Sequence, residues 1–145
     1  MPEPEMLASD LRVVLGRLVR RLRAERRGIS LAQVTVLGRL DRTGPAAISD
    51  LAAGERVRPQ SMAATVAALL AAGLVSRTPD ARDRRRVLIA LTPAGVEALA
   101  ADRRRREGWL SEAIERDLSP RERRVLADAT ALLARIAETE RGDSP

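Results

Sequence analysis

A charged hairpin constrains the fold of this chain more than any other feature of its sequence. Residues 74–78 (LVSRT) and 87–92 (VLIALT) are short runs rich in aliphatic and β-branched residues, which favour strands. The loop 79–86 between them carries four arginines and two aspartates. The pattern predicts a two-stranded hairpin with a long, exposed tip, and such an excess of like charge favours a partner of opposite sign.

Three helical segments are predicted before the hairpin. The first follows an S-x-x-Q capping box, in which Ser30 and Gln33 satisfy backbone N–H groups at the start of the helix. A short helix at 47–55 is expected to end near Gly54. The third, at 59–72, has a proline in its first turn, where the missing N–H costs nothing. Its predicted buried stripe comprises Met62, Val66, Leu69 and Leu70.

Longer amphipathic helices are predicted on both sides of this region. Residues 7–27 carry apolar side chains at helical spacing, and a long helix is expected over about 93–116. A last helix begins at the SPRE motif, where Ser119 and Glu122 form a second capping box. The final residues, 141–145, are expected to be a frayed tail.

This order of elements predicts a mainly α fold with a small β-hairpin. We expect a winged helix-turn-helix at about 30–92, within a single domain spanning 1–145. The helices at about 5–27 and 93–140 then form a frame around it, whose apolar stripes exceed what a lone winged helix would bury.

The composition argues against catalysis. The chain has no cysteine, histidine, tyrosine or phenylalanine, which removes the commonest general base and the usual transition-metal ligands. No nucleophile-elbow or phosphate-loop glycine pattern is present. We therefore expect no enzyme, no metal and no cofactor. No apolar run approaches the length of a membrane span and no signal-peptide pattern is seen, so a cytoplasmic protein is expected.

The net charge of +6 and the pI of about 11.4 favour an anionic partner. All 26 basic residues are arginine, a bias that a GC-rich genome would also produce, so the position of the charge is more informative than its total. The run 103–106 (RRRR) spreads around a helix, which favours solvated faces and salt bridges between subunits over one phosphate-binding patch.

The helix at 59–72 has the properties of a recognition helix. Its buried stripe fixes it to the core, and small or hydrogen-bonding side chains at its start can reach base edges in a major groove. The competing interpretation is that Gln60 and Ser61 only cap the helix. The predicted DNA-binding residues here are Arg58, Pro59, Gln60, Ser61, Ala64 and Thr65.

Residues 56–95 resemble the core of the MarR family of transcriptional regulators. The resemblance is carried by LLAAGLV leading into the hairpin, DARDRRR at its tip and LTPAG at the start of the next helix. The segment 118–136 also fits the last helix of the family, so the resemblance covers nearly the whole chain. One departure is Ala47, where a polar cap often precedes the third helix, so that cap must be weaker or supplied otherwise.

The resemblance implies a homodimer joined by the N-terminal helix and the last two helices. It also implies that Arg85, in the D-x-R pattern that starts at Asp83, enters the minor groove, while Asp83 orients the tip by pairing with a neighbouring arginine. An arginine at a hairpin tip suits a narrow minor groove on physical grounds as well. The remaining tip arginines, expected to neutralise phosphates, are Arg82, Arg84 and Arg86.

The sequence thus predicts a sequence-specific DNA-binding regulator, a dimeric repressor that reads an inverted repeat. The resemblance adds a small aromatic effector that releases the DNA, although no tyrosine or histidine is available to bind a phenol. The competing class is a basic helical RNA-binding or ribosome-associated protein. Against it, Trp109 is the sole aromatic residue, so there is no platform on which unpaired bases could stack.

Overall fold

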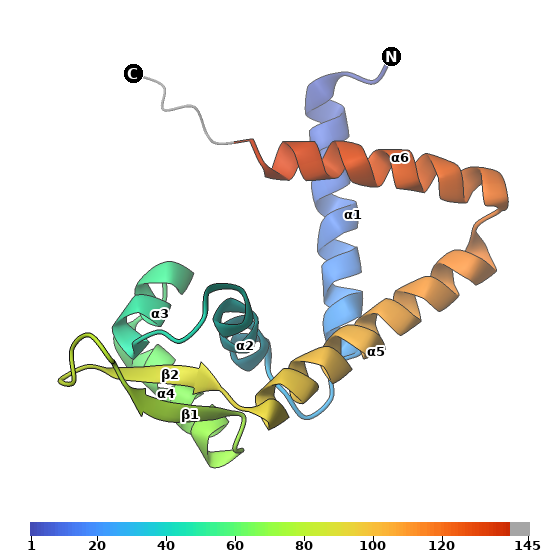
Figure 1. Ribbon diagram of the computed structural model, residues 1–145. Helices are drawn as coiled ribbons and strands as arrows, with labels where there is room; N and C mark the ends of the chain where they lie inside the picture. The colour runs from blue at the N-terminus through green and yellow to red at the C-terminus, as the bar shows by residue number, and fades with distance from the viewer. Residues whose placement is uncertain (140–145) are drawn as a thin grey trace, which may run out of the picture. The chain divides into compact units, whose positions relative to one another are not determined.

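The computed structural model describes residues 1–139 and confirms the predicted fold class. The predicted frayed tail lies outside the described residues. Among the described helices, none combines the length and the apolar character needed to cross a membrane. The elements in chain order are α1 (Pro4–Ala24), α2 (Leu31–Thr43), α3 (Ile48–Glu55), α4 (Pro59–Ala71), β1 (Val75–Pro79), β2 (Val87–Leu91), α5 (Pro93–Asp117) and α6 (Pro120–Ala137) (Figure 1).

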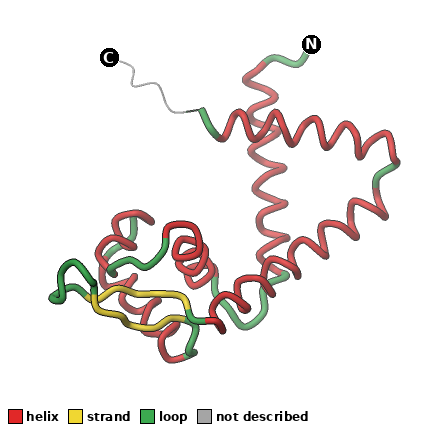
Figure 2. Tube along the Cα trace, viewed as in Figure 1, coloured by secondary structure: helices red, strands yellow, loops and turns green. Residues whose placement is uncertain are grey.

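The two strands form the predicted antiparallel hairpin, drawn in yellow in Figure 2. Val75 pairs with Leu91 at its base, and Pro79 pairs with Val87 where the tip begins. The loop before α3 adds a further connection, because Ala46 and Ile89 exchange backbone hydrogen bonds of 3.0 and 2.8 Å. The hairpin is therefore fastened to the start of α3.

The hydrophobic core lies where α2, α3 and α4 meet the hairpin and the first turns of α5 (Figure 1). Aliphatic side chains fill it, which agrees with a chain that has neither phenylalanine nor tyrosine. Each fully buried leucine or isoleucine contributes about 1.5–3 kcal/mol relative to an exposed position. The largest fully buried aliphatic side chains are Leu37, Leu51, Leu69, Ile89, Val36 and Val66.

The chain divides into two compact units, Met1–Glu107 and Gly108–Pro145. The first unit contains the winged helix-turn-helix together with α1 and the first turns of α5. In the second unit, the Arg123 guanidinium donates hydrogen bonds to the carbonyl oxygens of Glu115 (2.8 Å) and Leu118 (3.1 Å). These bonds fasten the start of α6 to the end of α5.

The third helix ends at Glu55, within one residue of the predicted end near Gly54. Gly54 has a different role, because a Cβ built there would lie 2.2 Å from Cζ of Arg39. The space beside this glycine accommodates the Arg39 guanidinium, which bonds to Glu55 at 3.2 Å. The left-handed residue that terminates α3 is Arg56. Ala47 makes no side-chain cap, as expected.

A carboxylate is fully buried in the middle of α5. Asp102 has an exposed fraction of 0% and lies 2.7 Å from the Arg106 guanidinium and 3.7 Å from that of Arg26. Burial lowers the pKa of Arg26, and the charge of Asp102 partly offsets that effect. Arg26 follows α1, so the cluster joins the chain after α1 to α5 within the first unit.

Both predicted capping boxes are present, and the contribution of the one at α2 to stability can be measured. The Gln33 N–H donates to Ser30 Oγ (3.1 Å), and the Ser30 N–H donates to Gln33 Oε1 (2.9 Å). Ser30→Ala should lower the free energy of unfolding by about 1 kcal/mol, because an N–H of the first turn loses its partner. Urea denaturation measures this loss of stability. Ser49→Ala is the control, since the exposed Ser49 side chain makes no hydrogen bond within residues 1–139. Equal stabilities of the two variants would contradict the capping role.

Candidate nucleic-acid interface

Helix α4 presents one buried and one exposed side. Met62, Val66 and Leu69 are buried in the core, whereas Gln60 and Ser61 are exposed in the first turn. The N-cap residue is Arg58, and no side chain caps the helix, so Gln60 and Ser61 are not cap residues. Polar side chains at the exposed start of a packed helix can hydrogen-bond to base edges. The other predicted residues of this helix, Pro59 and Ala64, are exposed, and Thr65 is half-buried.

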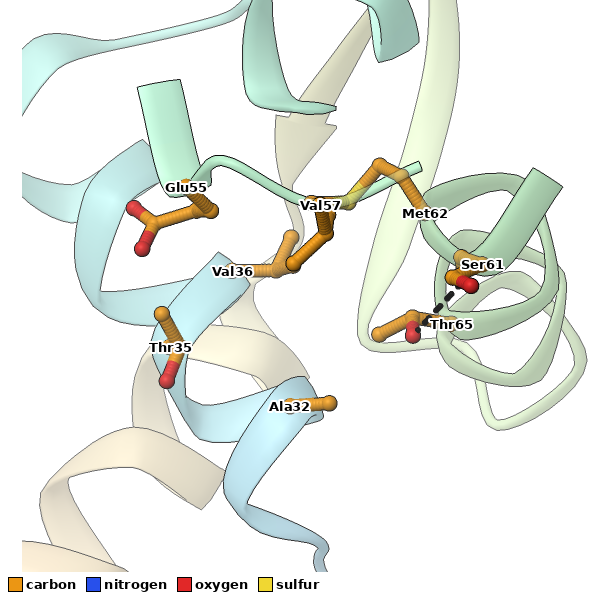
Figure 3. A pocket seen from close by; sticks show the side chains of 8 residues that line it. All are labelled: Ala32, Thr35, Val36, Glu55, Val57, Ser61, Met62 and Thr65. Atoms are coloured by element: carbon orange, nitrogen blue, oxygen red, sulfur yellow. Dashed lines mark hydrogen bonds between the residues drawn. The ribbon is translucent and has the colours of Figure 1, made fainter. Parts of the chain in front are cut away.

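A small pocket lies beside this helix, between α2 and α4 (Figure 3). Its volume is about 230 Å³, and Ser61 and Thr65 border it, whereas Gln60 and Ala64 do not. The Thr65 hydroxyl donates to the Ser61 carbonyl oxygen at 3.1 Å, drawn as the dashed line in Figure 3. Two of the predicted reading residues thus lie on the α2 side of α4. The remaining lining residues are Ala32, Thr35, Val36, Glu55, Val57 and Met62.

The hairpin tip has a defined shape set by its two aspartates. Asp80 Oδ1 accepts a hydrogen bond from the Arg82 N–H (2.9 Å), and Asp83 Oδ1 accepts one from the Arg85 N–H (3.1 Å). The Arg86 N–H also donates to the Asp83 carbonyl oxygen (2.9 Å). Short carboxylate side chains that bond to a backbone N–H two residues later stabilise tight turns.

This geometry corrects the role predicted for Asp83. The sequence suggested an ion pair with a neighbouring arginine, but no such pair involves Asp83 among the described residues. Asp83 Oδ1 accepts the hydrogen bond of the Arg85 N–H instead. Asp83 therefore shapes the tip through the backbone and leaves the guanidinium groups free to turn outward.

One tip arginine is engaged elsewhere in the molecule. The Arg86 guanidinium forms an ion pair with Asp50, in the first turn of α3. By contrast, Arg82, Arg84 and Arg85 are exposed, and their guanidinium groups form no ion pair or hydrogen bond within residues 1–139. Arg86 thus connects the tip to α3, and three arginines present uncompensated charge. No local sequence pattern points to Asp50, which is 36 residues away from Arg86.

The arginine side chains of the run 103–106 bond to other groups of the same chain. All four guanidinium groups bond to acceptors of the first unit, as ion pairs or to a backbone carbonyl, rather than forming a basic patch. The predicted salt bridges of this run thus have partners within the chain, and the prediction that the run does not form one phosphate-binding surface stays a prediction. The pairs are Arg103 with Asp41 (3.4 Å), Arg104 with Glu97 (2.7 Å), Arg105 with the Arg27 carbonyl (3.5 Å) and Arg106 with Asp102 (2.7 Å).

Comparisons with known proteins agree with this arrangement. The sequence pattern of the MarR family matches residues 29–87, which hold α2, α3, α4 and the hairpin tip. An HTH-type transcriptional regulator of Mycobacterium bovis is 37% identical over 134 residues, covering 91% of this chain and 93% of that protein. The HTH-type transcriptional repressor MdtR of Bacillus subtilis is 28% identical over 150 residues, covering 97% of this chain and 94% of that protein.

A solved structure shares the fold of this chain. A transcriptional regulator protein of Pseudomonas aeruginosa superposes with a TM-score of 0.84 at 37% sequence identity, covering 96% of this chain and 100% of that one. The family consists of DNA-binding regulators and not of enzymes, which agrees with the absence of catalytic motifs from the sequence. The chain belongs to the MarR family of transcriptional regulators.

Proposed function

We propose that this regulator binds a specific double-stranded DNA operator as a homodimer and represses transcription. The observation that carries the proposal is the hairpin tip, where three exposed arginines have no acidic partner among the described residues. Their mutual repulsion is relieved when phosphates neutralise them. The exposed, uncapped start of α4 supplies polar side chains in the same compact unit as that charge.

The two elements have different roles in this proposal. Gln60 and Ser61 read base edges in the major groove, because amide and hydroxyl groups offer both donors and acceptors. Arg85 enters the minor groove, where a narrow A/T-rich segment attracts a guanidinium. Arg82 and Arg84 bind phosphates and add affinity without sequence preference. Arg86 positions the tip through Asp50 and can reach a phosphate only by giving up that pair.

Exposed apolar side chains on the outer helices support a dimer. On α1, Leu7 and Val14 have exposed fractions of 54% and 57%. On α6, Val125 and Ile136 are exposed to 62% and 63%. Exposed aliphatic faces on helices favour association, and a second copy offers the same faces by two-fold symmetry. A two-fold dimer also places two recognition helices in successive major grooves.

A small effector that releases the DNA completes the proposal. A cavity of about 320 Å³ lies in the first unit between α2 and α5, with Val34 and Leu99 as its apolar part. Arg42, Arg103 and Arg106 also line it, of which Arg103 and Arg106 form ion pairs with Asp41 and Asp102. A cavity with apolar side chains and a few arginines suits a small aromatic anion, which would compete with Asp41 for Arg103.

Selection from random DNA duplexes tests the proposed operator. The bound pool should converge on an inverted repeat whose half-site centres are separated by about one helical turn, roughly 34–36 Å. A single unrepeated half-site would contradict binding as a two-fold dimer. A pool without any shared sequence would contradict sequence-specific recognition.

Substitutions in α4 should change which bases are preferred. Gln60→Ala and Ser61→Ala each remove a donor and an acceptor from the reading surface, so the selected operator should relax at one position per half-site, by about 1–3 kcal/mol. Repeating the selection with each variant measures it. Arg84→Ala is the control, because loss of a phosphate contact should lower affinity for all sequences and reduce the salt slope by about one. An unchanged preference in both α4 variants would assign base reading to other residues.

A further inference from the structure

Arg56 has an unusual backbone conformation for an arginine. It lies between α3 and α4 with φ of 53° and ψ of 42°, in the left-handed region. Within residues 1–139 it is the only non-glycine residue with positive φ. Side chains with a Cβ are disfavoured there because the Cβ approaches the neighbouring carbonyl oxygen.

The turn itself requires this conformation. The Arg56 N–H donates to the Ala53 carbonyl oxygen (3.2 Å), and the Val57 N–H donates to that of Ala52 (3.0 Å). These two bonds form a Schellman motif, whose left-handed position is usually occupied by glycine. The hydrogen bonds of the turn involve only backbone groups, so glycine at this position would form the same turn without the steric penalty.

The Arg56 side chain has no role in packing. It is exposed, and its guanidinium makes no ion pair or hydrogen bond within the described residues. The neighbouring Glu55, which could have bonded to it, is bound to Arg39 instead. The positive charge at this turn is therefore uncompensated, like the charge at the hairpin tip.

The position of Arg56 places it at the start of the recognition helix. It is two residues before Arg58, the N-cap of α4, so their Cα atoms are separated by at most about 7 Å. The N-terminal residues of a recognition helix contact base edges in the major groove, and the groove is bordered by phosphates. A guanidinium just before that helix is well placed to form a bidentate hydrogen bond with a phosphate.

We propose that Arg56 is a phosphate-contacting residue that fixes the position of α4 in the groove and is retained at the expense of backbone stability. The inference rests on the proposed operator binding. It predicts that one substitution lowers DNA affinity without lowering stability, as expected where a functional residue holds a strained backbone.

The test is Arg56→Gly, measured by thermal melting and by salt-titrated binding to the selected operator. Glycine relieves the steric penalty of the left-handed conformation, which exceeds the freedom it adds to the unfolded chain. The melting temperature should therefore equal that of the wild type or rise by about 2–5 °C. Operator affinity should fall by roughly fivefold or more, and the salt slope should decrease by about one.

Three companion variants make the outcome specific. Arg56→Ala retains the strained backbone. It should bind the operator as weakly as Arg56→Gly but melt at a lower temperature than Arg56→Gly. Arg56→Lys retains the charge and should keep the wild-type salt slope. Arg104→Ala removes the same charge from a paired position and should leave the slope unchanged.

Two results would overturn the inference. One is an Arg56→Gly variant with wild-type affinity and salt slope, while the wild type still prefers its operator. The other is an Arg56→Gly variant that loses stability and binding together, which would make Arg56 a structural residue. A wild type without operator preference would refute the proposed function itself, and the inference with it.

Discussion

Arg85→Ala is expected to reduce operator affinity by about 1–3 kcal/mol, roughly 5- to 150-fold, and to relax sequence preference at the flanks of the operator. Arg85 is exposed at the hairpin tip, and its own N–H is fixed by Asp83 at 3.1 Å. The backbone is thus ordered before DNA binds, so little freedom is lost on insertion into the minor groove. Fluorescence anisotropy with a labelled operator at fixed salt measures the loss.

Arg103→Ala is the matched control for that measurement. It removes the same charge from a position whose guanidinium lies 3.4 Å from Asp41, outside the hairpin tip. We expect its affinity to stay within about twofold of the wild type, because the pair compensates the charge before DNA is present. Equal losses in the two variants would show that only net charge matters and would remove the special role of the tip.

Asp102→Ala is expected to lower the free energy of unfolding by about 3–5 kcal/mol, the largest stability effect of any substitution considered. Asp102 is fully buried beside two guanidinium groups, those of Arg26 and Arg106. Removal of the carboxylate leaves two positive charges close together in a poorly solvated site, with nothing to compensate them.

The geometry of this cluster makes the charge of Asp102 more important than its hydrogen bonds. Although Arg106 approaches to 2.7 Å, neither carboxylate oxygen accepts a well-aligned hydrogen bond within the described residues. Asp102→Asn, which retains the shape, should therefore destabilise nearly as much as Asp102→Ala.

Urea denaturation of Asp102→Ala and Asp41→Ala provides the comparison. Asp41 forms a more exposed pair with Arg103 at 3.4 Å, and exposed pairs contribute about 0–1 kcal/mol. If Asp102→Ala lost no more stability than Asp41→Ala, the buried cluster would not hold the chain after α1 to α5.

Local signals in the sequence were sufficient for most of the fold. The capping boxes at Ser30 and Ser119 depend on residues three apart, and both are present. The hairpin follows from two short aliphatic runs with a charged loop between them, and its strands begin and end within one residue of the prediction. The core stripe of α4 follows from helical spacing. In each case, the interacting residues are close in the sequence.

Long-range contacts between polar groups could not be predicted in this way. The pair of Arg86 with Asp50 depends on how the hairpin packs against α3. The space at Gly54 depends on Arg39 from another helix, so the sequence predicted the helix end but not the packing role of the glycine or the left-handed conformation of Arg56. A signal for the buried Asp102 did exist, because it lies three residues after the buried Leu99 and therefore on the same helical face.

The contacts at the DNA interface depend on a partner and not only on the fold of this chain. Base contacts form only in the complex, so the reading roles of Gln60 and Ser61 and the minor-groove role of Arg85 stay predictions. What the structure contributes is which charges are already compensated. Arg86 and the run 103–106 have partners in the chain, whereas Arg82, Arg84 and Arg85 have none among the described residues.

The most direct measurement is a salt-titrated comparison of three ligands for the wild-type protein: the selected palindromic duplex, a scrambled duplex of the same composition, and a structured RNA. The palindrome should bind at least about 10³-fold more tightly than the scrambled duplex near physiological salt. Affinity for all three should fall with salt, because every complex releases counterions. Equal affinity for the three ligands would contradict a sequence-specific operator-binding regulator, and a clear preference for the RNA would favour the RNA-binding alternative.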